Sequence, residues 1–286
     1  MTMRLFPPLI TITLVLLLNV SSVSAETLRF APLPMENVET VLKKFQPLTQ
    51  YLTEQLALEI EYVYVDSYSD LLDKFQKSEI DLAYLGPLPY VELRQSFPEA
   101  VPLLFFKESA LTATYTCAFA TFPDNHFNVQ SGSYQNIALT QPLSTCGYLS
   151  VNGLMQKFSN SLEKNHYRYL GTHDAVALSI IRGEFAAGGL KTAVAKKYKH
   201  MGLFILTETP PLPAFALIAN TQTMSPKTRS AIASTLLRLN SDNAGLAKEK
   251  QTSNIIGYGV IEAEDADYQA VRDLLGSITI PQQGNF

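Results

Sequence analysis

The sequence has few of the residues from which catalytic and metal sites are built. It contains two cysteines, four histidines and no tryptophan among 286 residues. The two cysteines do not form a CxxC pair, and the histidines show no metal-ligand spacing. No GxSxG, HExxH or phosphate-binding glycine loop is present. We therefore expect no catalytic residue, no metal and no cofactor, and we do not expect an enzyme.

Positive charge is also scarce. The chain has 22 Lys and Arg against 26 Asp and Glu, which gives a formal net charge of -4. No run of basic residues is interleaved with aromatic ones, so nothing in the sequence attracts a polyanionic backbone. We therefore expect no nucleic-acid partner. Because 47% of the residues are hydrophobic, the chain can bury a full core and is long enough for two modest domains.

Beyond the N-terminus, no apolar stretch is long enough to span a membrane. The first residues have a positive charge at Arg4, an apolar stretch over 9–20 and the small-x-small pattern "VSA" before Glu26. This pattern predicts a signal peptide over 1–25, and no cysteine follows closely enough to carry a lipid anchor. We expect the mature chain to be exported to the periplasm and to be a monomer.

Export changes the meaning of the two cysteines, Cys117 and Cys146. In an oxidising compartment, a lone pair of cysteines forms a disulfide more often than it stays reduced. The alternative is that both are small buried hydrophobic residues. A zinc site is disfavoured because no cluster of Cys and His has ligand spacing.

Strands and helices alternate along the chain, with amphipathic stretches that begin at polar turns. The expected strands are 27–34, 58–65, 80–87, 114–121, 136–142, 166–172, 185–190 and 202–209. The expected helices are 36–56, 67–79, 146–159, 173–183, 191–200, 226–240 and 265–278. This order is typical of βαβ units, so we expect an α/β protein with largely parallel sheets flanked by helices.

A weak internal repeat relates 65–84 to 170–189. Both segments read as strand, polar turn, helix and strand, and the alignment places Tyr68 opposite His173. Each of these residues stands where a helix begins, beyond the carboxyl end of a strand, which is where open α/β sheets bind their ligands. The repeat predicts two similar lobes with one of these residues on each side of a cleft, although two unrelated βα units can also match this well.

The segment "PLSTCGYLS", residues 142–150, places Ser144, Thr145 and Cys146 directly before an expected helix. One hydroxyl is enough to cap a helix, which contributes about 1 kcal/mol of helix stability. Two hydroxyls and a thiol exceed that need. A helix N-terminus has unpaired N–H groups and partial positive charge, so added side-chain donors make an anion site. Both interpretations, a cap and an anion site, are open at this point.

Several segments together resemble a known family. The order of "EIDLAYLGPLPYVE", "STCGYL", "HDAVALSIIRGE" and "TPPLP" is similar to that of the PhnD-like phosphonate, phosphite and phosphate-binding proteins of ABC transporters. The resemblance covers nearly the whole mature chain. It implies a two-lobed periplasmic binding protein fold of type II, each lobe a mostly parallel sheet flanked by helices, with a ligand cleft between the lobes. Such a protein captures a small oxyanion and delivers it to an ABC permease.

The resemblance also implies a division of the chain and a second possible role. We expect one lobe over 26–113 plus 214–286 and the other over 114–213, with crossing strands at 110–119 and 210–219. The alternative function is a periplasmic ligand sensor of the same fold, which signals through a membrane receptor or kinase, because a fold alone does not decide what its closed form contacts.

The resemblance implies ligand contacts at individual positions of this sequence. Ser144 and Thr145 match the anion-contacting Ser-Thr-Ser of the family, with Cys146 at the third position, where a thiol is a weak donor and a disulfide would donate nothing. The family's aromatic and imidazole contacts match Tyr68, Tyr115 and His173. The alternatives are that Tyr68 is a surface turn residue, that Tyr115 packs in the core and that His173 caps a helix. The candidate ligand-binding residues are Tyr68, Tyr115, Ser144, Thr145, Cys146 and His173.

Three positions depart from the family. Members that hold an aminoalkyl phosphonate place acidic residues around the ammonium group, and the residues aligned with those are Ala193 and Phe215. The strand "FAAGG" likewise has Ala186 where the family has an acid. These departures predict that the protein has no preference for an amine on the ligand.

Overall fold

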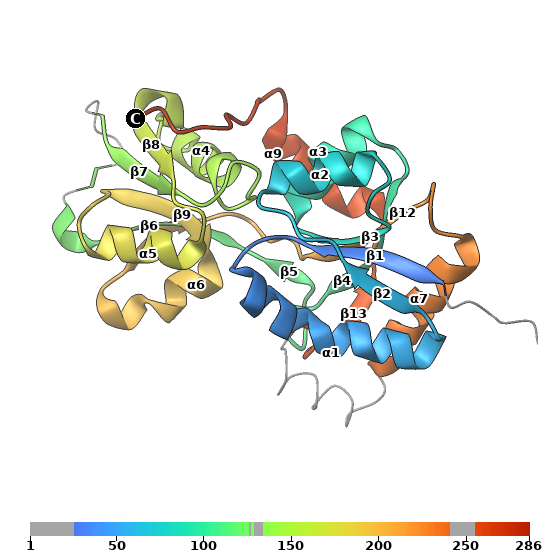
Figure 1. Cartoon of the computed structure of the whole chain (residues 1–286). Coiled ribbons are helices and arrows are strands. Elements are labelled where there is room, and N and C mark those ends of the chain that lie inside the picture. Colours follow the sequence, from blue (N-terminus) through green and yellow to red (C-terminus); the bar gives the residue numbers. More distant parts are fainter. Residues whose placement is uncertain (1–25, 126, 129–133, 241–254) are drawn as a thin grey trace, which may run out of the picture.

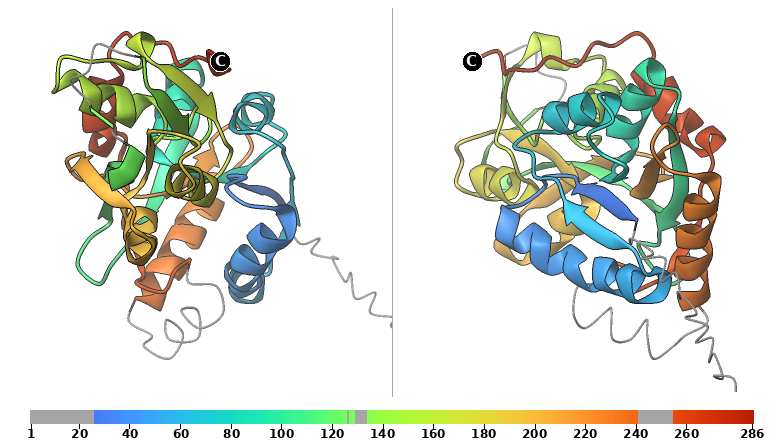
Figure 2. Two further views of the ribbon diagram at one scale, coloured as in Figure 1. Left: turned by 90° about the vertical axis from the view of Figure 1, so that its left-hand side faces the viewer. Right: turned by 45° about the vertical axis from the view of Figure 1, so that its right-hand side comes forward.

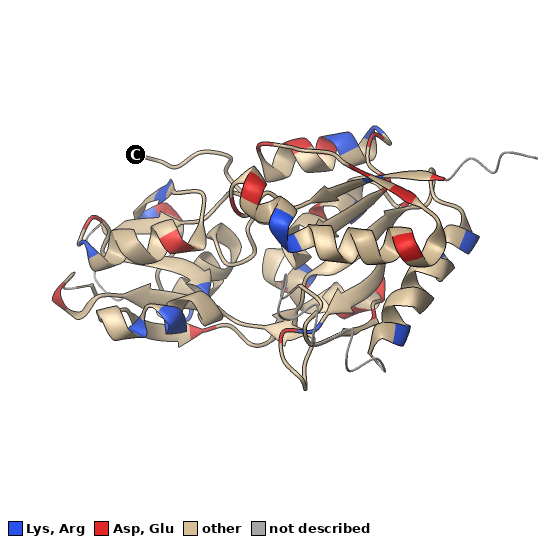
Figure 3. Ribbon diagram, turned by 60° about the horizontal axis from the view of Figure 1, so that its bottom comes forward, with Lys and Arg blue, Asp and Glu red and all other residues tan. Residues whose placement is uncertain are grey.

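The chain folds into two lobes that lie side by side, each built on one sheet (Figure 1). The computed structural model describes residues 26–286 except 126, 129–133 and 241–254. The predicted signal peptide, 1–25, lies outside the described residues. Acidic and basic residues are interspersed along the ribbon of both lobes (Figure 3).

The elements follow one another closely. The strands are β1 (Thr27–Pro32), β2 (Glu59–Tyr62), β3 (Leu82–Leu85), β4 (Ala100–Phe106), β5 (Thr114–Tyr115), β6 (Cys117–Thr121), β7 (Asn136–Leu139), β8 (His166–Tyr169), β9 (Ala187–Lys191), β10 (Phe204–Glu208), β11 (Leu212–Pro213), β12 (Ala216–Asn220) and β13 (Val260–Glu262). The α-helices are α1 (Val38–Leu56), α2 (Tyr68–Gln76), α3 (Pro87–Ser96), α4 (Tyr148–Gln156), α5 (His173–Ile181), α6 (Thr192–Lys197), α7 (Pro226–Leu239) and α9 (Gln269–Leu275). Single 3₁₀ turns are η1 (Pro123–Asn125), η2 (Leu162–Lys164), η3 (Lys199–Met201) and η4 (Asp265–Tyr268).

Five strands of the first sheet have the same arrangement as the five strands of the second, and β13 is an additional edge strand of the first. The first has the order β13-β4-β12-β3-β1-β2 and the second β10-β6-β9-β7-β8. In the first lobe, β1 lies between β2 and β3. In the second lobe, β7 lies between β8 and β9 in the same way. The similarity of 65–84 to 170–189 therefore reflects equivalent places in two lobes, as predicted.

The sheets are less parallel than the sequence predicted. Strand β1 is parallel to β2 and β3, and β7 is parallel to β8 and β9, but β12 and β6 are antiparallel to all their neighbours. Strands β6 and β12 each enter their sheet directly after a crossing between the lobes, because β6 follows β5 and β12 follows β11. Both strands therefore start at the cleft, where the strands of the βαβ units end, and must run in the opposite direction.

The crossings themselves form a small separate sheet. Strands β5 and β11 pair antiparallel, with Leu212 opposite Tyr115. They lie within the segments 110–119 and 210–219 that the sequence marks as crossing strands. The exact limits of the lobes, 26–113 plus 214–286 and 114–213, stay a prediction.

The C-terminal segment returns to the second lobe after α9 (Figures 1 and 2). The backbone N–H of Asn285 donates to the carbonyl of Tyr167, and its side-chain oxygen accepts from the N–H of the same residue. The guanidinium of Arg168 lies 4.5 Å from the ring centroid of Phe286. The tail thus lies along the edge strand β8 of the second lobe, after a helix, α9, that packs against both α3 of the first lobe and α4 of the second.

Buried apolar side chains hold both lobes in place. One cluster runs from α2 and α3 of the first lobe into α4 of the second, and it includes Leu71, Tyr90, Cys117 and Leu149. A second cluster lies between the first sheet and the helices α1 and α7, and a third lies between the second sheet and α5. The continuous cluster joins the lobes, so their relative position is set by packing as well as by the crossing strands.

Candidate ligand-binding cavity between the two lobes

A small cavity lies where the two lobes meet. All six predicted ligand-binding residues line it, namely Tyr68, Tyr115, Ser144, Thr145, Cys146 and His173. Five further residues complete the lining, and these are Leu33, Gly86, Pro89, Lys191 and Phe215. Its volume of about 10 Å³ is close to the minimum that holds one water molecule. The lobes are therefore closed on each other, and a ligand can enter the cavity only when they separate.

Helix N-termini from both lobes converge on this cavity. Tyr68 is the first residue of α2 and His173 is the first residue of α5. Gly86 is the N-cap of α3, and the segment 144–147 leads into α4. Because the parallel strands all end at the cleft, the helices that follow them all begin there. Their partial positive charges add at one point, which favours an anion.

The caps of α2 and α5 are made by the residues before the predicted contacts. The Ser67 hydroxyl accepts from the N–H of Asp70, and the Thr172 hydroxyl accepts from the N–H of Ala175. The capping role considered for His173 is therefore taken by its neighbour, and Tyr68 is buried in the core rather than exposed on a turn. Both side chains are left to line the cavity.

The segment before α4, which we call the anion loop (142–147), does not cap its helix with a side chain. The N-cap is Gly147, which has no capping side chain. Within the described residues, the N–H groups of Thr145 and Cys146 and the hydroxyl of Ser144 have no hydrogen-bond partner, although all three residues are buried. Buried N–H groups without a partner are rare in folded proteins. The anion loop thus presents donors to the cavity that nothing in the chain satisfies.

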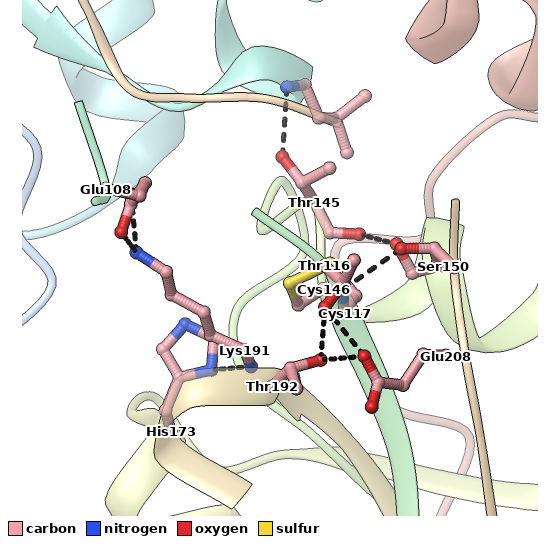
Figure 4. The surroundings of a disulfide bond; sticks show 12 residues. Glu108, Thr116, Cys117, Thr145, Cys146, Ser150, His173, Lys191, Thr192 and Glu208 are labelled. Atoms are coloured by element: carbon pink, nitrogen blue, oxygen red, sulfur yellow. Dashed lines mark hydrogen bonds and ion pairs between the residues drawn. A yellow bond between two sulfur atoms is a disulfide. The ribbon is translucent and has the colours of Figure 1, made fainter. Parts of the chain in front are cut away.

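The Thr145 hydroxyl bridges the lobes. Its oxygen accepts a hydrogen bond of 3.0 Å from the backbone N–H of Leu88, in the first turn of α3 (Figure 4). The carbonyl of Thr145 accepts from the hydroxyl of Ser150 at 2.5 Å, which ties the loop to α4. A hydroxyl can accept a hydrogen bond from one group while it donates one to another. The Thr145 hydroxyl can therefore contact the first lobe and a ligand at the same time.

A disulfide joins Cys117 to Cys146, with the two Cα atoms 5.0 Å apart (Figure 4). The predicted pairing is confirmed, and Cys146 can no longer donate a hydrogen bond from sulfur. The bond connects the anion loop to the start of β6, directly after the crossing. Gly189 on β9 allows this approach, because a Cβ there would lie 2.6 Å from the Cys146 carbonyl oxygen.

The two tyrosines stay protonated. Burial raises the pKa of Tyr68 and of Tyr115 well above the usual value, and for Tyr115 a hydrogen bond with Thr145 opposes part of the increase. A neutral phenol donates a hydrogen bond to an oxyanion without adding charge. Tyr115 is 8% exposed, so it packs in the core and borders the cavity at once.

His173 is held neutral with a defined tautomer. Its Nδ1 accepts a hydrogen bond of 3.1 Å from the backbone N–H of Lys191, which leaves the proton on Nε2. Burial, together with the charge of Lys191, lowers the pKa of His173 to about 4. The imidazole is therefore a neutral hydrogen-bond donor at pH 7.

This depressed pKa makes stability fall as the pH is lowered. Between pH 6.5 and about 4, the unfolded chain takes up a proton at His173 that the folded chain does not. We expect the wild type to lose about 2 kcal/mol more unfolding free energy than His173→Asn between pH 7 and 4.5. Urea titrations of both proteins at the two pH values measure this difference. Equal losses would show that His173 titrates normally in the folded protein.

Lys191 and Glu108 are the charged residues that sequence reasoning missed. Lys191 ends β9, and its Nζ lies 2.7 Å from both carboxylate oxygens of Glu108, which follows β4 (Figure 4). The position of Lys191 at the carboxyl end of a strand was a usable signal. Its partner stands 83 residues away in the sequence, so no local pattern indicates the pair.

In the described part of the chain, no group of three or more His, Cys, Asp or Glu side chains is arranged to hold a metal ion. Over the same residues, no helix has both the length and the apolar composition needed to cross a membrane.

Comparison with known proteins decides the family. The model of the family described as "ABC transporter, phosphonate, periplasmic substrate-binding protein" matches residues 30–268. The chain belongs to this family. It is thus a substrate-binding component of the PhnD type, as the resemblance implied.

Individual relatives of this phosphonate-binding family are distant in sequence. The phosphate-import protein PhnD of Mycolicibacterium smegmatis is 23% identical over 278 residues, which cover 88% of this chain and 87% of that one. A probable ABC transporter phosphite-binding protein, PhnD1 of Prochlorococcus marinus, is 23% identical over 64% of this chain and 66% of its own. The structure of PhnD1 from Prochlorococcus marinus in complex with methylphosphonate has a TM-score of 0.75 at 18% identity, covering 88% of this chain and 98% of that one. The last likeness supports the two-lobed fold.

The predicted departures from the phosphonate-binding family differ in importance. Ala193 is exposed in α6 and does not line the cavity, and Ala186 precedes β9 at the end away from it. Phe215 does line the cavity, with its ring centroid 5.9 Å from that of Tyr115. Of these three residues, only Phe215 is placed to influence which ligand fits.

Proposed function

We propose that the cavity binds a small tetrahedral oxyanion of the phosphonate, phosphite or phosphate type. The observation that carries this proposal is the set of unpartnered donors at the meeting point of the helix N-termini. It comprises the N–H groups of Thr145 and Cys146 and the hydroxyls of Ser144 and Tyr68. These donors are neutral, and preorganised neutral donors at helix N-termini hold an oxyanion without a cation.

The relatives support this ligand class. One is named for phosphate import, another for phosphite binding, and the solved structure of PhnD1 holds methylphosphonate. All three ligands have a tetrahedral phosphorus with several oxygens, so they present acceptors in several directions. Donors from both lobes can then contact one ligand, and that requirement fits a cavity between the lobes.

Binding and closure are coupled through Thr145. In the closed form its oxygen accepts from the N–H of Leu88 in the first lobe, and its own hydrogen can turn from Tyr115 to the ligand. Opening of the lobes breaks the contact with Leu88 and exposes the cavity. A bound oxyanion stabilises the closed form, which the permease of the transporter then recognises.

The remaining parts of the proposal concern the setting of the protein. We propose that residues 1–25 are removed as a signal peptide, that the mature chain works in the periplasm as a monomer, and that its partner is the permease of an ABC transporter. The pattern "VSA" before Glu26 supports cleavage after Ala25.

Calorimetric titration of the mature chain tests the ligand class. The protein is unfolded and refolded to remove any carried-over ligand and is then titrated with methylphosphonate, phosphite, phosphate and, as a control, acetate. We expect at least one phosphorus oxyanion to bind with a Kd in the micromolar range or below, about 8 kcal/mol of binding free energy, and acetate not to bind. Heat from none of the three phosphorus compounds would contradict the proposal.

A further inference from the structure

A cation pocket adjoins the proposed oxyanion site, and a residue of the protein occupies it. The Lys191 ammonium, at the end of β9, lies 2.7 Å from each carboxylate oxygen of Glu108. About a fifth of the Lys191 side chain and a quarter of the Glu108 side chain are exposed (21% and 26%). The pair is therefore largely removed from solvent, where an ion pair is worth more than on the surface.

Two aromatic rings complete the pocket around the ammonium. The Lys191 Nζ lies 4.9 Å from the ring centroid of Tyr115 and 5.5 Å from that of Phe215. A carboxylate together with aromatic faces is the chemistry that proteins use to hold an ammonium group of a ligand. Tyr115, Phe215 and Lys191 all line the same cavity as the anion loop. An ammonium on a short chain attached to the oxyanion would therefore compete for the place that Lys191 fills.

Lys191 also protects the oxyanion site from the charge of Glu108. Without the lysine, an unpaired carboxylate would stand beside the cavity and repel a bound anion. The same carboxylate would attract an ammonium group on the ligand. The identity of residue 191 should therefore affect anions with and without an amine in opposite directions.

We propose that Lys191 determines ligand specificity by filling this cation pocket with the protein's own ammonium group, so that amine-free oxyanions are selected. The inference rests on the proposed binding of phosphorus oxyanions in this cavity. It explains why a neutral phenylalanine can stand at 215, beside an ammonium that Glu108 already neutralises.

The test compares 2-aminoethylphosphonate with ethylphosphonate by calorimetry on the mature chain. For the wild type, we expect the amine to give no advantage. For Lys191→Met, we expect ethylphosphonate to bind more weakly and the amine to be favoured, with a change of roughly tenfold or more in the ratio of the two Kd values. Lys191→Arg keeps the positive charge and is expected to keep the wild-type preference.

Two further variants distinguish a role of the Lys191–Glu108 ion pair in ligand specificity from a purely structural role. Glu108→Gln keeps the lysine but removes the carboxylate, and it should shift the ratio further against the amine. The double variant Lys191→Met with Glu108→Gln should return the ratio to near one, because neither charge remains.

An unchanged ratio in both Lys191→Met and Glu108→Gln would overturn the inference, since a latch between the lobes would change the affinity for both ligands equally. If the wild type bound neither compound nor any other phosphorus oxyanion, the proposed function itself would fail. Thermal melting of each variant confirms that the compared proteins are folded.

Discussion

Removal of the disulfide should lower the free energy of unfolding by about 3 to 4 kcal/mol. The two cysteines are separated by 29 residues, and the chain-entropy model gives this cost for an unfolded loop of that length. Both side chains are buried, so replacement by alanine adds a packing loss. The double variant Cys117→Ala with Cys146→Ala, compared with the oxidised wild type in urea, measures the effect.

The same bond should matter for binding. It fixes the anion loop to the start of β6, so its loss frees the loop that carries Ser144 and Thr145 and should weaken methylphosphonate binding. A reducing agent should lower the melting temperature of the wild type and leave that of the double alanine variant unchanged. Native protein whose two thiols both react with an alkylating agent would contradict the presence of the bond.

Thr145→Val should weaken methylphosphonate binding about ten- to a hundredfold, or roughly 1.5 to 3 kcal/mol. The substitution keeps the shape of the side chain but removes its hydroxyl. The N–H of Leu88 then has no acceptor in the closed form, and the ligand loses a donor to one of its charged oxygens. Both losses act on the closed, bound state, so the affinity should fall more than the stability of the free protein.

A matched control lies five residues earlier. The Thr140 hydroxyl is buried without a hydrogen-bond partner, and Thr140 does not line the cavity. Thr140→Val makes the same chemical change at a site where no interaction is lost, so it should leave affinity within about twofold of the wild type. Thr145→Ser keeps the hydroxyl and should retain most of the binding. If Thr145→Val bound as tightly as Thr140→Val, the anion loop would not hold the ligand.

Sequence reasoning located the parts of the site that local patterns specify. A polar turn followed by an amphipathic stretch predicts where a helix begins, and this rule placed Tyr68 and His173 at the starts of α2 and α5, where the structure has them. The run Ser144-Thr145-Cys146 exceeded the needs of a cap, and the structure assigns the N-cap to Gly147 instead. Local sequence patterns were therefore enough to predict most residues of the candidate site.

Features that depend on distant contacts could not be predicted in this way. Lys191 pairs with Glu108 only because the crossing strands bring the two lobes together. From the sequence alone, a lysine at a helix start is expected to be exposed to solvent. Helix α3 begins "PLP", which local propensity disfavours, yet its two prolines stand in the first turn, where a missing N–H costs little. Strand β4 contains an internal proline, Pro102. Because proline is rare inside strands, the sequence pattern did not predict this strand.

The crystal structure of the mature chain with methylphosphonate tests the central claim most directly. We expect the phosphonate oxygens to lie about 2.7 to 3.2 Å from the Thr145 hydroxyl, the Ser144 hydroxyl and Nε2 of His173. We also expect Lys191 to remain paired with Glu108 in the complex. A phosphonate bound elsewhere, or held in this cavity by Lys191 with the anion loop out of contact, would contradict the proposed role of the anion loop.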